Sequence, residues 1–124
     1  MAVKESKQSL GQRGEDHAAK YLLSLGWQII ERNWRCREGE LDIVAFDGAH
    51  TIVFVEVKTR AGLGFGSPLE SITYKKVRTL MTLAYRWLKS HDLRAKNIRL
   101  DAVGILMRPG REPELNHVRG IGTW

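Results

Sequence analysis

The spacing of apolar residues in the first half of the chain predicts one helix followed by three strands. The helix is expected over residues 10–25, where apolar side chains recur at helical intervals, and Gly26 follows at a position where helices commonly end. Stretches rich in β-branched and aromatic residues, separated by turn residues, predict strands at 27–36, 40–46 and 51–59.

The second half opens with a glycine-rich loop at 61–68 and then returns to helical spacing. Apolar residues over 72–88 predict a long amphipathic helix with basic residues on its other faces, and Thr73 is suited to cap its start. Two further strands are predicted at 98–107 and 114–118. The order helix, three strands, helix, two strands predicts an α/β fold, in which helices cover the faces of a mixed β-sheet. Because no repeat or low-complexity linker appears, residues 1–124 are expected to form a single domain.

The predicted strand at 51–59 carries charge where alternation alone would place apolar residues. Valines at every second position occupy one face, which belongs in a core. The other face begins with Ile52 and Phe54, which indicates that it is covered too, and continues with Glu56 and Lys58. A carboxylate and an ammonium group at a partly covered position are unfavourable unless they are paired or bound to an ion.

The preceding strand supplies a partner for these charges. A hairpin closed through a three-residue loop would place Asp42 opposite Glu56 and Glu40 opposite Lys58. Leu41, Ile43 and Ala45 would then share the other face of the strand. Two facing carboxylates repel unless a cation lies between them. Carboxylate oxygens are the ligands that Mg²⁺ or Mn²⁺ prefers, so this hairpin predicts a divalent-metal site.

A third carboxylate is expected from the first helix. Glu15 precedes Ala18, Ala19 and Leu22 by three, four and seven residues, which places it on their apolar stripe. Lys58, one strand pitch from Glu56, could stabilise developing negative charge or orient an attacking water. Each feature also has a structural interpretation: a salt-bridge cluster on the hairpin, and a first-turn glutamate favoured by the helix dipole. The combination of these residues favours a catalytic site over a purely structural cluster.

The net charge of +6 is unevenly distributed. Residues 1–60 hold nine bases and nine acids, whereas 61–124 hold eleven bases and five acids. Such an excess suits a polyanion such as nucleic acid, and it suits a solvated helix face equally well. The candidate phosphate contacts flank the strand that carries the predicted site: Arg60, Lys75 and Lys76.

Composition excludes several other classes of protein. No apolar run approaches the roughly 20 residues of a membrane span, and the first residues lack the apolar stretch of a secretory signal. A single cysteine, Cys36, forms no internal disulfide and fits a reducing compartment, so a cytoplasmic location is expected. The glycine loop lacks the Gly-Lys-Ser/Thr of a nucleotide-binding loop, and the histidines lack metal-ligand spacing. Three tryptophans could stack on bases, although packing is the favoured interpretation: Trp34, Trp87 and Trp124.

Asp42 together with Glu56-Val57-Lys58 resembles the Asp…Glu-x-Lys signature of restriction-endonuclease-like nucleases. More narrowly, the chain resembles the bacterial YraN-like family of predicted endonucleases, which is similar to archaeal Holliday junction resolvases. The resemblance covers nearly the whole length. Its matching segments are Gly11–Glu15, Gly39–Asp42, Val53–Arg60, Phe65-Gly66, Lys76 and Arg99–Asp101.

The resemblance implies a restriction-endonuclease-like fold and a Mg²⁺- or Mn²⁺-dependent site acting on DNA. It implies metal ligation by Asp42 and Glu56, with Glu15 as a further ligand or water-orienting group and Lys58 as base or charge stabiliser. Leu41 stands where the signature often has proline. Cutting both strands of a junction needs two active sites, so the resemblance to resolvases also implies a homodimer.

Two hypotheses of function remain open at this point. The first is a metal-dependent DNA endonuclease that selects the shape of branched or junction-like DNA, since no recognition helix or zinc finger is found that would read base edges. The second is a non-catalytic nucleic-acid-binding or assembly module that retains the nuclease fold.

Overall fold

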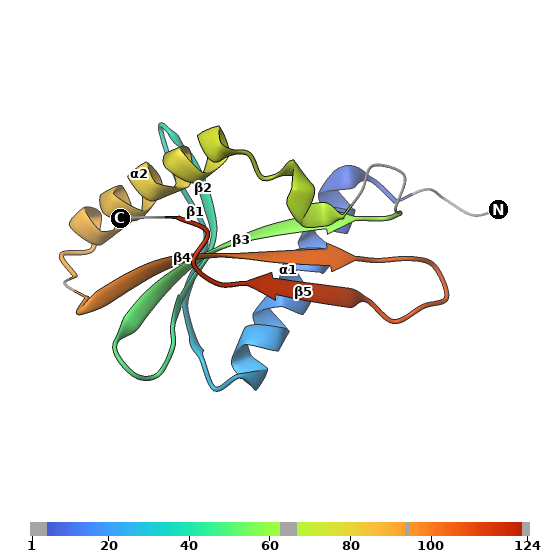
Figure 1. Ribbon diagram of the computed structural model, residues 1–124, viewed down its shortest axis with the longest axis horizontal. Coiled ribbons are helices and arrows are strands. Elements are labelled where there is room, and N and C mark those ends of the chain that lie inside the picture. The colour runs from blue at the N-terminus through green and yellow to red at the C-terminus, as the bar shows by residue number, and fades with distance from the viewer. Residues whose placement is uncertain (1–4, 63–66, 94, 123–124) are drawn as a thin grey trace.

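Five strands form one mixed sheet in the computed structural model, which describes residues 5–62, 67–93 and 95–122 (Figure 1). The strands lie side by side in chain order: β1 (Gln28–Cys36), β2 (Gly39–Phe46), β3 (Thr51–Arg60), β4 (Asn97–Leu106) and β5 (Glu114–Val118). Neighbouring strands run antiparallel except β3 and β4, which are parallel. The connection between β3 and β4 carries the 3₁₀ turn η1 (Pro68–Ser71) and the helix α2 (Tyr74–Ser90).

The two helices cover opposite faces of the sheet, which confirms the predicted fold class. α1 (Lys7–Ser24) packs against Val53 and Val55 of β3, whereas α2 packs against Ile52 and Phe54. Both faces of this central strand are therefore buried, as its sequence predicts. Thr73 caps α2 as expected, since its hydroxyl accepts a hydrogen bond of 3.1 Å from the Lys76 amide.

The structure adds to the sequence prediction at two places. α1 begins at Lys7, one turn earlier than the apolar spacing indicated, because the Ser6 side chain caps it by accepting a bond from the Ser9 amide. The turn η1 was not predicted. Two predicted features lie outside the described residues: Phe65-Gly66 and Trp124. Within the described ranges, no helix is long and apolar enough to cross a membrane.

The β2–β3 register is the predicted one. Ile43 lies opposite Val55 and Val44 opposite Phe54, the register that brings Asp42 to Glu56. Pairing between these two strands runs from Phe46 only as far as Ile43, whereas β2 stays paired with β1 down to Gly39. The sheet therefore opens between β2 and β3 at Asp42.

The predicted face of Leu41 was wrong. Leu41 packs with Val44 in the cluster under α2, although simple alternation places it with Ile43 on the α1 side. The cause lies in β1, where Asn33 has a left-handed backbone (φ 56°) between the two residues that pair with Ile43 and Leu41. Asn33 interrupts the regular alternation of side chains in β1. In β2, the side chains that follow on from the same position therefore point to the opposite side of the sheet from that expected.

Close contact between α1 and β3 requires glycine at position 14. A Cβ atom built on Gly14 would lie 1.9 Å from Oγ1 of Thr59, whereas one built on Gly11 would meet nothing within 4 Å. Gly14 thus sets the depth at which the first turns of α1, and the adjacent Glu15, rest on the sheet.

We expect Gly14→Ala to lower the free energy of unfolding by about 1–3 kcal/mol, because α1 must move away from Thr59. Gly11→Ala is the matched control, and it should raise stability by about 0.5–1 kcal/mol through helix propensity alone. Urea unfolding followed by circular dichroism measures both. Equal stabilities for the two variants would contradict the close packing.

Candidate active site

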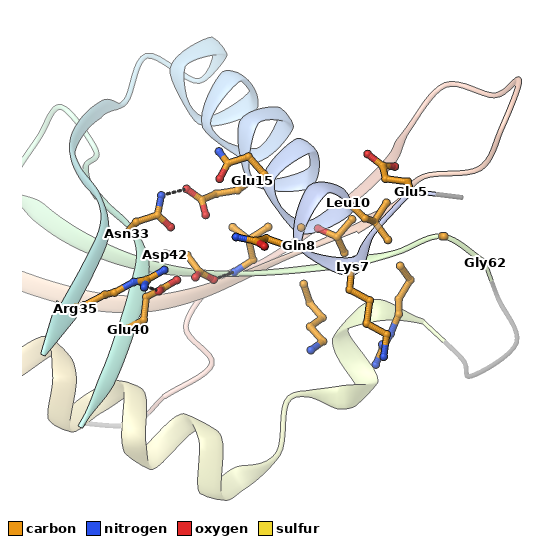
Figure 2. Close-up of a pocket in the computed structure, with 17 residues that line it drawn as sticks. Glu5, Lys7, Gln8, Leu10, Glu15, Asn33, Arg35, Glu40, Asp42 and Gly62 are labelled. Carbon is orange, nitrogen blue, oxygen red and sulfur yellow. Dashed lines mark hydrogen bonds and ion pairs between the residues drawn. The ribbon is translucent and has the colours of Figure 1, made fainter. Parts of the chain in front are cut away.

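A cleft of about 790 Å³ lies where β2 and β3 part, beneath the first turns of α1 (Figure 2). Four of the predicted site residues line it: Glu15 from α1, Asp42 from β2, and Lys58 and Arg60 from β3. Figure 2 shows Glu15 and Asp42 reaching toward the same space from the helix and from the opened strand. Residues far apart in the sequence are therefore brought together as predicted.

Asp42 takes over a hydrogen bond of the sheet at the point where the strands separate. Its Oδ2 atom accepts a 2.8 Å bond from the Val57 amide of β3, in place of a backbone carbonyl of β2. This bond fixes the carboxyl at the floor of the cleft. The local irregularity at Asp42 is thus compensated by its own side chain.

The carboxyl groups of Asp42 and Glu56 are hydrogen-bonded to each other. Burial, followed by the hydrogen bond and the charge of Glu56, raises the pKa of Asp42 to about 8, while the Val57 amide and the Lys76 charge oppose the rise. At neutral pH the pair therefore shares one proton. A proton between two buried carboxylates occupies a position that a cation can take.

Glu56 is 8% exposed and faces α2. Its Oε2 atom lies 3.3 Å from Nζ of Lys76, which was predicted as a phosphate contact and here forms an ion pair inside the site. The sequence analysis did not predict this pairing, because Glu56 lies on a strand and Lys76 lies twenty residues later, on a helix. When the pair holds one proton, the positive charge of the lysine balances the negative charge that remains.

Glu15 faces inward as predicted and is 7% exposed. Arg32 Nε and Asn33 Nδ2 both donate to its Oε1 atom, at 2.9 and 3.0 Å. Burial raises the pKa of Glu15, Arg32 lowers it and the nearby Asp42 charge raises it further. Arg32 and Asn33 were missed by the sequence reasoning; the only signal was an asparagine inside a predicted strand, a residue that tolerates the left-handed backbone found there.

The three predicted phosphate contacts do not form one patch. Arg60 lines the cleft beside Lys58, Lys76 pairs with Glu56, and Lys75 lines a second hollow along the outer side of α2. The predicted approach of Glu40 to Lys58 is not formed among the described residues. β2 has left β3 at that level, and Glu40 pairs instead with Arg35 across β1 and β2, at 2.6 Å.

The Arg99–Asp101 segment serves the architecture of the sheet. Asp101 is fully buried and accepts bonds from Arg99 Nε, His117 Nε2 and the Gly120 amide, at 2.8, 2.8 and 3.0 Å. These bonds join β4 to β5 and to the chain that follows it. Trp87 is also structural: it is buried in the core under α2, as the packing interpretation predicts.

The donor set fits a divalent cation held by two carboxylates. In the described part of the chain, no three Asp, Glu, His or Cys side chains form a ready-made metal cage. Mg²⁺ is commonly bound by one or two carboxylates and completed by waters and substrate phosphates, and the proton shared by Asp42 and Glu56 marks where positive charge is needed. Glu15 adds negative charge next to Asp42, while its own carboxyl is held by β1.

Comparison with known proteins places the chain in a family. Residues 14–105 match the family described as "Uncharacterised protein family UPF0102". A UPF0102 protein of Nocardia farcinica is 49% identical over 93% of this chain and 90% of its own length, and one of Clavibacter michiganensis subsp. michiganensis is 50% identical over 91% and 95%. A UPF0102 protein of Mycobacterium tuberculosis is 50% identical over 91% of both chains. The protein that carries this two-carboxylate cleft thus belongs to the UPF0102 family, in agreement with its YraN-like motifs.

Proposed function

We propose that this protein is a metal-dependent endonuclease that hydrolyses phosphodiester bonds of DNA in the cleft between β2 and β3. The observation that carries the proposal is the buried pair Asp42–Glu56, which shares a proton next to an open cleft lined by lysine and arginine. Burying two carboxyl groups side by side costs free energy, because Asp42 must stay protonated at neutral pH when no metal is bound. The same arrangement suits an enzyme that must hold Mg²⁺ or Mn²⁺ beside a phosphate.

A cation held by Asp42 and Glu56 would neutralise charge on the phosphodiester and lower the pKa of an attacking water. The Val57 amide keeps the Asp42 carboxyl in place for this role. Glu15, fixed by its two donors on β1, orients a water through its negative charge. Lys58 stabilises the negative charge that develops on the phosphate, and Arg60 binds a neighbouring phosphate.

Selectivity for the shape of DNA fits the described elements better than selectivity for base sequence. α1 and α2 both lie on the sheet and use their buried faces for the core, and neither stands out from the fold as a recognition helix does. Junction-like or branched DNA is therefore the proposed substrate. A homodimer that presents two clefts would allow both strands of a junction to be cut.

The competing function is a nucleic-acid-binding or assembly module without catalysis. The lack of a three-residue metal cage among the described residues favours it, as does the basic surface of α2. It does not account for two carboxyl groups held side by side in a buried position, where one of them must keep a proton at neutral pH. Cleavage experiments separate the two functions.

Asp42→Asn and Glu56→Gln should each lower cleavage of DNA by roughly a hundred-fold or more, because each removes a carboxylate that holds the cation. The assay uses labelled four-way junction, flap, duplex and single-stranded DNA with Mg²⁺, Mn²⁺ or EDTA. Glu112→Gln is the matched control, since it neutralises an exposed carboxylate outside the cleft.

Binding of the same DNA measured in EDTA should be little changed by Asp42→Asn. If wild type cuts nothing with either metal, yet wild type and the variant bind DNA equally, the binding-module function replaces the nuclease. Cleavage that persists in Asp42→Asn would remove this carboxylate from the mechanism.

The carboxyl pair also predicts a pH-dependent stability. Folding raises the pKa of Asp42 from 3.8 to about 8, so between these values the folded protein holds a proton that the unfolded chain has lost. The stability of the metal-free protein should therefore fall as pH rises through this window. Asp42→Asn mimics the protonated acid, and near pH 8 we expect it to be more stable than wild type by about 1 kcal/mol or more.

Mg²⁺ or Mn²⁺ should raise the Tm of wild type, more at pH 8 than at pH 6, because binding must displace the shared proton. Asp42→Asn should show no such rise. Differential scanning fluorimetry across this pH range, with and without metal, provides the measurement. A metal-induced rise of equal size in both proteins would place the cation elsewhere.

A further inference from the structure

One side of α1 lines the cleft with residues at helical intervals. Gly11, Gln12 and Glu15 follow Gln8 by three, four and seven residues, so all four share one face of the helix, and all four line the cleft. Figure 2 shows Gln8 extending from the helix into the cleft on the side where Asp42 lies. We call the surface of Gln8, Gly11 and Gln12 the α1 face. It has no part in the carboxyl pair.

Gly11 is a glycine that the packing of the fold does not require. Glycine in the interior of a helix lowers stability relative to alanine, because it loses more conformational freedom on folding. Close contact with Thr59 explains the glycine at position 14, whereas a Cβ atom on Gly11 would meet nothing within 4 Å. A glycine at an open position in the wall of a cleft lets another molecule approach the helix backbone closely.

The two glutamines beside Gly11 present amide groups to the cleft. Nε2 of Gln12 donates a 3.1 Å hydrogen bond to Asp16, which leaves the other N–H and the oxygen of that amide to the cleft. The Gln8 side chain forms no hydrogen bond with the residues that the structure describes. Both glutamines are exposed and uncharged. Glutamine amides are among the groups that bond to the sugar and phosphate oxygens of nucleic acid.

The opposite wall of the cleft is basic. Lys58 and Arg60 line it from β3, and within the described ranges neither forms an ion pair. A chain of phosphates lying between the two walls would therefore meet cations on one side and amide donors on the other. An apolar ligand would leave both sets of polar groups without a partner.

The length of the α1 face determines how much of a nucleic-acid strand it can contact. Gln8 and Glu15 are seven residues apart, which corresponds to about 10 Å along the axis of the helix. Each strand of B-DNA carries one phosphate per about 3.4 Å of the duplex axis. The α1 face together with Glu15 therefore spans about three nucleotides.

We infer that the α1 face binds the DNA strand beside the phosphate that is cut. The sugar–phosphate backbone packs against Gly11, the amides of Gln8 and Gln12 bond to its oxygens, and the cations of β3 hold its phosphates from the opposite wall. The inference rests on the proposed function and extends it by assigning the path of the strand along α1. Contacts of this kind carry no sequence information, so the strand is held whatever its bases.

Binding of a fluorescein-labelled flap DNA in EDTA, measured by fluorescence anisotropy, tests the inference without any cleavage. Gly11→Ala should weaken binding by about five-fold or more, and Gly11→Leu further, because each new side chain occupies space that the strand needs. Gln8→Ala and Gln12→Ala should each weaken it by about three-fold through a lost hydrogen bond. His17→Ala, exposed on α1 outside the cleft, is the matched control and should bind as wild type does.

Thermal melting separates a binding role of Gly11 from a structural one. Gly11→Ala should raise Tm by about 2–4 °C through helix propensity, so stability and DNA binding should change in opposite directions. A fall in Tm would overturn the inference, because the fold itself would then require the glycine. Equal binding of flap DNA by wild type and both Gly11 variants would overturn it as well.

Cleavage of the same flap DNA in Mg²⁺ distinguishes this inference from the proposed nuclease. Weaker binding by Gly11→Ala, with a wild type that cuts no DNA, would support the α1 face and remove the nuclease function. A wild type that cuts, with Gly11 variants that bind and cut equally well, would support the nuclease and remove the α1 face. A wild type that binds no flap DNA overturns the inference, whether or not it binds polyglutamate instead.

Discussion

The hydrogen bond from the Val57 amide to the Asp42 carboxyl is the interaction on which the site depends. It forms where β2 leaves β3, so one side chain both completes the interrupted ladder and marks the base of the opening. The same position places Asp42 against Glu56, and burial with this contact raises the pKa of Asp42. The opening of the sheet and the acid–base character of the site thus have one origin.

Both layers of the fold contribute to this opening. Glu15 comes from the helix on one face and is oriented by β1, whereas Glu56 belongs to the other face and is paired with Lys76 of α2. The close approach allowed by Gly14 brings the first of these carboxylates to the right depth. The helices on the two faces of the sheet and the gap between β2 and β3 therefore bring together three carboxylates from three different elements.

α2 has a different role on each side. Its inner side is fixed by its own residue Trp87, which is buried against the sheet and donates a 2.9 Å hydrogen bond to Glu31 of β1. Its outer side carries two exposed tyrosines, Tyr74 and Tyr85, and the basic residues Lys75 and Arg78.

The sequence by itself determined the two α-helices and five strands, their order, the register of β2 with β3 and the inward direction of Glu15. These features follow from periodicity and from the cost of burying charge. Tertiary structure decided the face of Leu41, the pairing of Lys76 with Glu56 and the anchoring of Glu15 by Arg32 and Asn33. A left-handed residue in a neighbouring strand and contacts between distant elements produced these features. Local patterns record which side of an element is buried, whereas the partner that meets it across the fold depends on how the elements pack.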